Sequence, residues 1–308
     1  MTFAVLCPGQ GAQQPALLDF VDRFPDSVRV VNDAANALDE NLRERVKDAD
    51  AIYRNSIAQP LIAVAQLAQW VALRHELPAP VALAGYSVGE LACYGVGGGL
   101  DAGELARVAR ARADAMDAAT ADNPGGLIGV HGLTRAPLQR LCEATHAYIS
   151  IAIADDTHVI GGSDAALARI REHCLDAGAK VTELRVGIAS HTPLLTAAAE
   201  GFRNALERSS LSAPTIPVVA GVDATLVATR ARAIQTLSAQ ISHTIEWAHC
   251  LDALYERGCR VFLELAPGRA LSKMVRERFG NVEARSVDEF RELAGAARWA
   301  AKKLGDRS

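Results

Sequence analysis

Short apolar runs alternate with longer helical stretches in the first part of the chain. The runs Phe3–Cys7 and Val81–Ala84 have the length of buried strands, and Leu61–Leu77 and Glu104–Ala119 have the spacing of helices. Strands that alternate with helices are typical of an α/β fold around a mainly parallel sheet. We therefore predict such a sheet for this part of the chain.

The pattern changes after the turn-forming residues 123–126 and returns to its first form after Gly187. The intervening stretch predicts strand, helix, two strands, helix and strand, an order that resembles a ferredoxin-like subdomain. Its predicted strands are Leu127–Val130, Ala147–Ile153, His158–Ile160 and Lys180–Val186, and its helices are Ala136–Thr145 and Asp164–Ala177. The later predicted elements are Pro193–Leu206, Ile216–Ala220, Trp247–Arg257, Val261–Leu265, Arg269–Phe279 and a closing helix, Glu289–Lys303.

These patterns predict an α/β protein made of two parts. A large α/β-hydrolase-like subdomain with a mainly parallel sheet consists of residues 1–124 and 188–308. A ferredoxin-like (βαββαβ) subdomain, residues 125–187, is inserted into it.

The composition fits a large core and a small-molecule or protein substrate. Half of the 308 residues are hydrophobic, and a net charge of -4 with intermixed signs argues against nucleic acid or an anionic membrane as partner. The six cysteines have no metal or disulfide spacing, so we expect no metal site and reduced thiols. The N-terminus lacks a basic signal region and no apolar run approaches a membrane-spanning length, so we expect a cytoplasmic, soluble protein.

The clearest chemical signal is a serine between two glycines, Gly85-Tyr-Ser87-Val-Gly89, directly after the apolar run Val81–Ala84. A strand that enters G-x-S-x-G before a helix is the context of a nucleophile elbow, which exposes the serine hydroxyl. The N–H of Val88 would then point at a developing oxyanion. The alternative is a turn serine that only caps the helix.

A glycine-containing loop, Cys7–Gln13, follows the first predicted strand. Loops at the carboxyl ends of strands are where α/β folds bind substrates. The N–H of Gln10 is therefore a candidate second oxyanion donor, although the loop could equally be a structural turn.

Helical spacing places Arg112 in the middle of the apolar stripe of Glu104–Ala119. An inward guanidinium needs an anionic or strongly polar partner, because an unpaired buried charge is very costly. Its planar fork suits bidentate capture of a carboxylate. The alternative is an internal salt bridge to a buried Asp or Glu.

A serine nucleophile needs a base, and His191 lies on a loop just before Pro193, which can open a helix. The pattern alone does not dismiss four other histidines: His131, His158, His243 and His249.

Five stretches together resemble the malonyl-CoA:acyl-carrier-protein transacylase family, in the family's order and over most of the chain: Pro8–Gln13, Gly85–Glu90, Arg112, Ser190–His191 and Leu265–Gly268. The resemblance implies that Ser87 is acylated, that His191 is its base and that Arg112 binds the free carboxylate of malonate. It also implies an oxyanion hole from the N–H groups of Gln10 and Val88. Malonyl-CoA is then the substrate, the thiol arm of an acyl-carrier protein is the acceptor, and no cofactor is needed.

Within that family, the stretches Cys7–Gln10, Gly85–Leu91 and Ser190–Leu195 look like those of the malonate decarboxylase epsilon subunit. In addition, Tyr86 stands where fatty-acid enzymes usually carry His. This resemblance implies a carrier subunit with a phosphoribosyl-dephospho-CoA arm and other decarboxylase subunits as partners. The stretch Gln240–Trp247 departs from the family pattern and leaves His243 and Glu246 as candidates to orient His191. The loop Ala154–Thr157 also departs from the family pattern, so the resemblance implies no carrier or CoA contacts for its residues.

Two other functions remain open from the sequence. A serine hydrolase or thioesterase would use the same elbow and pass the acyl group to water, although it would usually place Asp or Glu between Ser and His along the chain. A non-catalytic carrier-docking subunit would keep an idle site. The inward Arg112 favours the transferase over the hydrolase.

Overall fold

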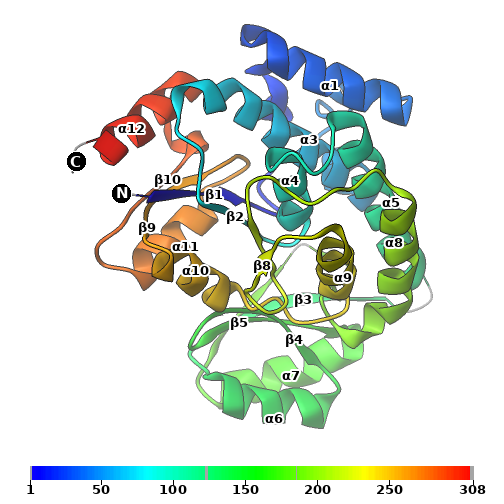
Figure 1. Cartoon of the computed structure of the whole chain (residues 1–308). Helices are drawn as coiled ribbons and strands as arrows, with labels where there is room; N and C mark the ends of the chain where they lie inside the picture. The colour runs from blue at the N-terminus through cyan, green and yellow to red at the C-terminus, as the bar shows by residue number, and fades with distance from the viewer. Residues whose placement is uncertain (1, 122–123, 185, 306–308) are drawn as a thin grey trace.

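The computed structural model describes residues 2–121, 124–184 and 186–305. Within these ranges the strands form two sheets, of six and of four strands (Figure 1). Two predicted features fall partly outside the described residues: the turn at Asn123 and position 185 of the last strand predicted for the insertion.

The larger sheet is mainly parallel, as predicted. Its order is β10-β9-β1-β2-β7-β8, and every neighbouring pair is parallel except β7 and β8. The strands are β1 (Thr2–Cys7), β2 (Ala82–Gly85), β7 (Val218–Val219), β8 (Leu226–Val227), β9 (Cys259–Glu264) and β10 (Glu283–Ser286). Phe3 and Val5 lie in one apolar core and Ala4 and Leu6 in another, which is why β1 is apolar from Phe3 to Cys7.

Helices cover both faces of this sheet (Figure 1). One group consists of α1 (Pro25–Leu38), α3 (Asn55–Leu73), α4 (Val88–Val96), α5 (Ala102–Thr120), α8 (Thr196–Arg208) and α12 (Leu293–Gly305), and it shares the larger apolar core. On the other side lie α10 (Trp247–Glu256) and α11 (Ala270–Arg278). The short α2 (Leu42–Arg45) follows α1, and α9 (Arg230–Gln240) packs against α8.

The smaller sheet has the order and connectivity predicted for the insertion. Its strands are antiparallel in the order β4-β5-β3-β6, and two helices cover one face. The elements are β3 (Gly125–His131), α6 (Arg135–Thr145), β4 (Tyr148–Ala154), β5 (Thr157–Ser163), α7 (Asp164–Asp176) and β6 (Lys180–Glu183). Leu127, Ile151 and Val159 pack in one cluster with Trp247 of α10, so the two parts of the protein share a core where they meet.

The helix α3 begins six residues before its predicted start, and Pro60 lies inside it. A proline there cannot donate to the carbonyl of Ser56, which normally breaks a helix. Arg110 of α5 supplies the missing donor, because its Nε lies 2.7 Å from that carbonyl oxygen. A side chain distant in sequence therefore allows the helix to start early.

The expectation that no apolar stretch reaches membrane-spanning length is wrong for Asn55–Glu76. Among the described residues this is the one helical stretch that is long and apolar enough to cross a membrane. Its most apolar 18 residues have a mean hydropathy of 1.3, and 89% of them are buried inside the protein. It packs against α1, α4 and α5. Its apolarity is therefore that of a central core helix.

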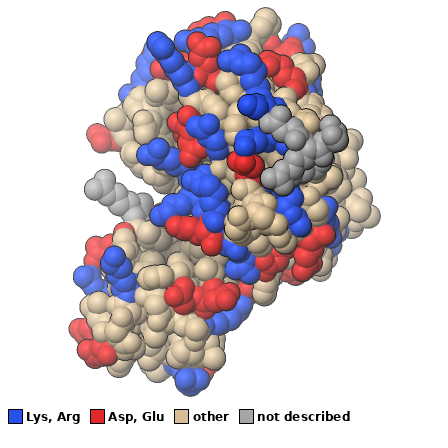
Figure 2. Space-filling view, turned by 90° about the vertical axis from the view of Figure 1, so that its left-hand side faces the viewer, with Lys and Arg blue, Asp and Glu red and all other residues tan. Residues whose placement is uncertain are grey.

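On the face in Figure 2, acidic and basic side chains are interspersed on both sides of the waist between the two parts.

Candidate active site

Ser87 lies on the tight turn between β2 and α4, with a strained backbone at φ 57° and ψ -121°. The flanking glycines are needed for this turn. A Cβ on Gly85 would lie 2.1 Å from the nitrogen of Glu90, and one on Gly89 would lie 1.9 Å from the carbonyl oxygen of Cys7. The predicted strand, turn and helix are therefore present, and the geometry is that of a nucleophile elbow.

His191 reaches the elbow from the loop before α8. Its Nε2 lies 2.9 Å from the Ser87 hydroxyl oxygen, and its Nδ1 lies 2.6 Å from the main-chain oxygen of Gln240. A carbonyl can only accept, so the proton is on Nδ1 and the lone pair of Nε2 faces the serine hydroxyl. This is the tautomer that a general base needs.

The candidates for orienting His191 were wrong. His243 directs its Nδ1 toward the Ser242 hydroxyl and the Ala239 carbonyl, at 3.0 Å each. Glu246 accepts two hydrogen bonds of 2.7 Å from Arg135. The stretch that departs from the family pattern does supply the orienting group, but through its backbone at Gln240 and not through an ionisable side chain.

Burial sets the protonation state of His191. The side chain is 1% exposed, and desolvation, followed by the charge of Arg112, lowers its pKa to about 3. It is therefore neutral over the whole physiological range. The Gln240 carbonyl at Nδ1 raises this pKa only in part, because a neutral carbonyl stabilises the protonated ring less than a carboxylate would.

Arg112 projects from α5 into the site, as its place on the apolar stripe predicted. It is 1% exposed, and it donates to Gln59 Oε1 at 2.8 Å, Gln240 Oε1 at 3.0 Å and the Ser87 hydroxyl at 3.4 Å. Burial lowers its pKa to about 10, so it stays charged at neutral pH. The internal salt bridge considered from the sequence is not found among the described residues. The guanidinium can therefore bind an anion beside the nucleophile.

The loop after β1 packs directly against the elbow. A Cβ on Gly9 would lie 2.7 Å from the Tyr86 oxygen and 3.5 Å from the Ser87 Cβ. Side-chain amides hold this loop in place, since Gln66 donates to the Pro8 carbonyl at 2.7 Å and Gln10 donates to Asn55 at 2.9 Å.

The other candidate oxyanion donor, Val88, is the first residue of α4. The N–H groups at the start of a helix have no acceptor within the helix. Val88 directly follows Ser87, and Gln10 follows Gly9, which lies against the elbow, so both N–H groups stay candidates for the oxyanion hole.

Residues 4–297 match the family of acyl transferase domains. The chain belongs to this family. Over 297 residues it is 27% identical to the malonyl CoA-acyl carrier protein transacylase of Haemophilus influenzae, a match that covers 93% of this chain and 95% of the relative. It is 29% identical over 295 residues to the enzyme of the same name from Mycobacterium bovis, with 94% and 97% covered.

Solved structures of similar proteins share the fold of this acyl transferase. The malonyl-CoA:acyl carrier protein transacylase of Xanthomonas oryzae superposes with a TM-score of 0.92 at 28% identity, over 97% of this chain and 99% of that one. A malonyl-transacylase solved in complex with a type II PKS acyl-carrier protein has a TM-score of 0.92 at 25% identity, with 97% and 99% covered.

Three side chains at the centre of this acyl transferase were not predicted from the sequence. Gln59 and the side chain of Gln240 hold Arg112, and Glu90 accepts from the Gln240 amide. Burial raises the pKa of Glu90 to about 7. The available signal was the position of Glu90 in the apolar segment Val88–Val96, where an isolated carboxylate requires buried donors.

A cavity of about 410 Å³ opens beside the elbow. Gly9, Gln10 and Tyr86 form one wall, and the smaller sheet forms the opposite wall with Val130 and Val159. Both parts of the protein line it, and its lining is largely apolar. The cavity could therefore hold a thin, mainly apolar chain beside the turn that carries Ser87, although Ser87 itself does not line it.

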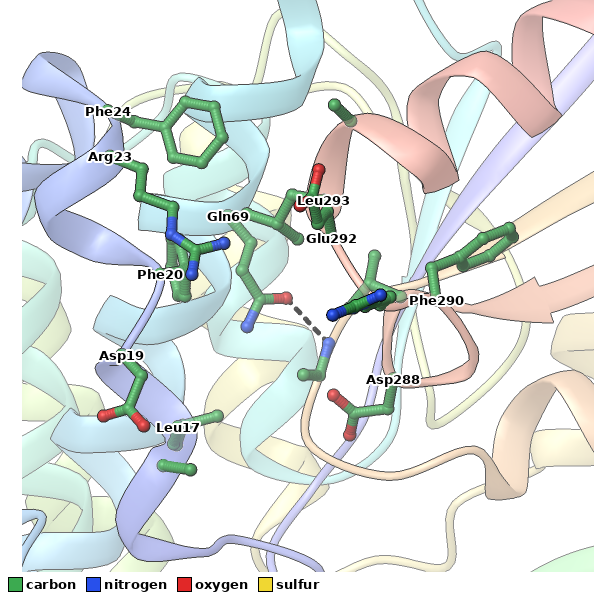
Figure 3. A pocket seen from close by; sticks show the side chains of 15 residues that line it. Leu17, Asp19, Phe20, Arg23, Phe24, Gln69, Asp288, Phe290, Glu292 and Leu293 are labelled. Atoms are coloured by element: carbon green, nitrogen blue, oxygen red, sulfur yellow. Dashed lines mark hydrogen bonds between the residues drawn. The ribbon is translucent and has the colours of Figure 1, made fainter.

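A second cavity, of about 310 Å³, lies between the N-terminal segment and the start of α12 (Figure 3). Its walls include Phe20, Phe24 and Phe290, and none of the catalytic candidates lines it. Gln69 on its inner wall accepts a hydrogen bond from the Ala266 nitrogen at 2.7 Å, the contact drawn in Figure 3. This amide anchors the turn that leads to Pro267 and Gly268, which line the first cavity.

The pKa of His191 predicts an unusual pH dependence for the reactivity of Ser87. A histidine with its ordinary pKa would be mostly protonated at about pH 5, and a serine activated by it would react more than tenfold slower there than at about pH 8. We expect modification by a fluorophosphonate to proceed at nearly the same rate across this range, because His191 stays neutral. The pseudo-first-order rate measured by intact mass tests this, and an inflection near the ordinary histidine pKa would contradict it.

Proposed function

We propose that this chain transfers a malonyl group from malonyl-CoA to the thiol arm of an acyl carrier protein through a malonyl-Ser87 intermediate. The observation that carries the proposal is the buried guanidinium of Arg112, which lies 3.4 Å from the serine hydroxyl and has neutral amides as its closest partners. An acyl group that ends in a carboxylate would give the guanidinium a directly bonded anion. The names of the two relatives and of the solved structures support the same substrate.

The site supports a two-step exchange. His191 takes the hydroxyl proton as Ser87 attacks the thioester carbonyl, and the N–H groups of Gln10 and Val88 stabilise the resulting oxyanion. The carbonyl reforms, the CoA sulfur leaves, and the proton on His191 goes to it. In the second step His191 takes the proton of the carrier thiol, and the sulfur attacks the serine ester. The carrier thioester forms as the Ser87 oxygen leaves, and His191 returns the proton to that oxygen.

Two alternatives fit the site less well. A hydrolase of this type usually holds its histidine with a carboxylate, whereas the partner of His191 is the Gln240 carbonyl. A hydrolase also has no need of a buried cation beside the nucleophile. A docking subunit without activity would not need Ser87 and His191 at hydrogen-bond distance with a reactive tautomer.

We further propose that the carrier belongs to a malonate decarboxylase. The proposal is supported by the sequence of three stretches that resemble the malonate decarboxylase epsilon subunit, Cys7–Gln10, Gly85–Leu91 and Ser190–Leu195, and by Tyr86 in the elbow. The partners would then be a carrier subunit with a phosphoribosyl-dephospho-CoA arm and other decarboxylase subunits. We place the reaction in the cytoplasm, because all six cysteines are free thiols.

The malonyl-enzyme is the intermediate that separates these functions. Wild-type protein mixed with malonyl-CoA is expected to gain the mass of one malonyl group, and Ser87→Ala is expected to gain none while its thermal unfolding is unchanged. Intact-protein mass spectrometry measures both. Labelling of the variant would place the nucleophile elsewhere, and a wild-type adduct lost to water at the same rate with or without carrier would indicate a hydrolase. The decarboxylase role predicts faster transfer to a carrier with a phosphoribosyl-dephospho-CoA arm than to an acyl-carrier protein with a phosphopantetheine arm.

Substrate choice is expected to depend on Arg112. Arg112→Ala removes the charge-assisted bonds to the malonyl carboxylate, which should lower the ratio of kcat/KM for malonyl-CoA to that for acetyl-CoA by about 10-fold or more. Arg112→Lys should restore little, because an ammonium lacks the planar fork. Arg107→Ala, on the exposed face of the same helix, is the matched control and should leave the ratio unchanged. Equal losses for both substrates in Arg112→Ala would contradict the assignment.

A further inference from the structure

Gln240 is the residue on which the catalytic and binding groups meet. Its main-chain oxygen accepts from His191, its Oε1 accepts from Arg112 at 3.0 Å, and its Nε2 donates to the main-chain oxygen of Ser87 at 3.2 Å. The same Nε2 also donates to Oε2 of Glu90. The side chain of Gln240 therefore links Arg112 to a carboxylate that touches none of the reacting atoms.

The Glu90 carboxylate points into the protein core and does not cap its own helix. It is the third residue of α4, the position from which a glutamate usually bonds back to the N-cap nitrogen. Its carboxylate instead turns into the core, where it is fully buried and accepts from the Gly221 nitrogen at 3.0 Å. A Cβ on Gly221 would lie 2.7 Å from Oε2, so the backbone there leaves room for this oxygen.

The contacts of the Gln240 amide permit only one orientation. Arg112 can only donate, so it requires the amide oxygen, and Glu90 accepts at Oε2, so it requires the amide nitrogen. A half-turn of the amide would place its NH₂ group against the guanidinium and its oxygen against the carboxylate. Both contacts would then be repulsive, and Arg112 would have to move.

We propose that Glu90 is a positioning residue for substrate choice, because it fixes the Gln240 amide so that Arg112 is held beside Ser87 to bind the substrate carboxylate. This inference rests on the proposed function. It separates two roles of Gln240. The side chain positions Arg112 under the control of Glu90, and the main chain positions His191 independently of it.

The separation predicts a selective loss. In Glu90→Met the Gln240 amide loses its charged acceptor and keeps only the 3.2 Å bond to the Ser87 main-chain oxygen. The kcat/KM for malonyl-CoA should therefore fall about 10- to 100-fold, the usual worth of one hydrogen bond to a charged group. The loss should appear in KM. The kcat for acetyl-CoA should stay near wild type, because His191 is held by the Gln240 main chain. Glu90→Gln keeps an oxygen in the position of Oε2 and should retain malonyl preference.

Two further variants test the Gln240 link and control for folding. Glu90→Leu combined with Gln240→Leu removes the buried carboxylate together with the amide that donates to it, and it also takes from Arg112 its acceptor at 3.0 Å. The malonyl preference should therefore fall at least as far as in Glu90→Met. Ser27→Ala loses a buried 2.7 Å bond to the Ala68 carbonyl, far from the site, and should lower thermal stability without changing the ratio.

Steady-state kinetics with both thioesters decides the matter. The inference is overturned if Glu90→Met or the double variant keeps the wild-type ratio, if Glu90→Gln loses as much as Glu90→Met, or if both substrates suffer equally. Failure of the proposed function would look different, since the wild type itself would then form no malonyl-Ser87.

Discussion

The site depends on one buried cation. Arg112 lies almost out of contact with solvent, and a guanidinium in that position is tolerated only when its donors are bonded and its charge is balanced nearby. The protein satisfies the donors with the amide oxygens of Gln59 and Gln240 and places the Glu90 carboxylate behind the second amide. A direct salt bridge would have used up the charge. An amide between the two ions keeps the guanidinium in place and leaves it able to bind a substrate carboxylate.

The nucleophile and its base are held mainly by backbone contacts. The elbow depends on glycines that let the loop after β1 approach within contact distance, and His191 is held by a carbonyl at the end of α9. Such groups do not rotate or change protonation. The catalytic pair is therefore preorganised by the backbone, whereas Arg112 and the Gln240 amide are held by side-chain hydrogen bonds.

Local patterns in the sequence predicted the fold and the main site residues. Ser87, His191 and Arg112 each have a local signal: a glycine pair after a strand, a loop before a helix-opening proline, and a charge on an apolar stripe. The parallel sheet and the βαββαβ insertion were predicted for the same reason, since alternation and turns are local features. The resemblance to a known family joined these signals into one site.

What could not be predicted depends on contacts between distant residues. The helix through Pro60 needs a donor from Arg110, which no local pattern shows. The partner of His191 is a main-chain atom 49 positions away, so a search for an ionisable side chain pointed to His243 and Glu246 instead. Glu90 and Gln240 are 150 positions apart, and only the tertiary fold brings their side chains within hydrogen-bond distance.

If the charge of Arg112 is left available for a carboxylate, the preference for malonyl-CoA must already be present in binding, before any chemistry. Ser87→Ala cannot be acylated, so calorimetry on this variant measures the affinity for intact thioesters. We expect malonyl-CoA to bind at least about 10-fold more tightly than acetyl-CoA, and we expect the difference to vanish when Arg112→Ala is added. Equal affinities for the two thioesters in Ser87→Ala would contradict it.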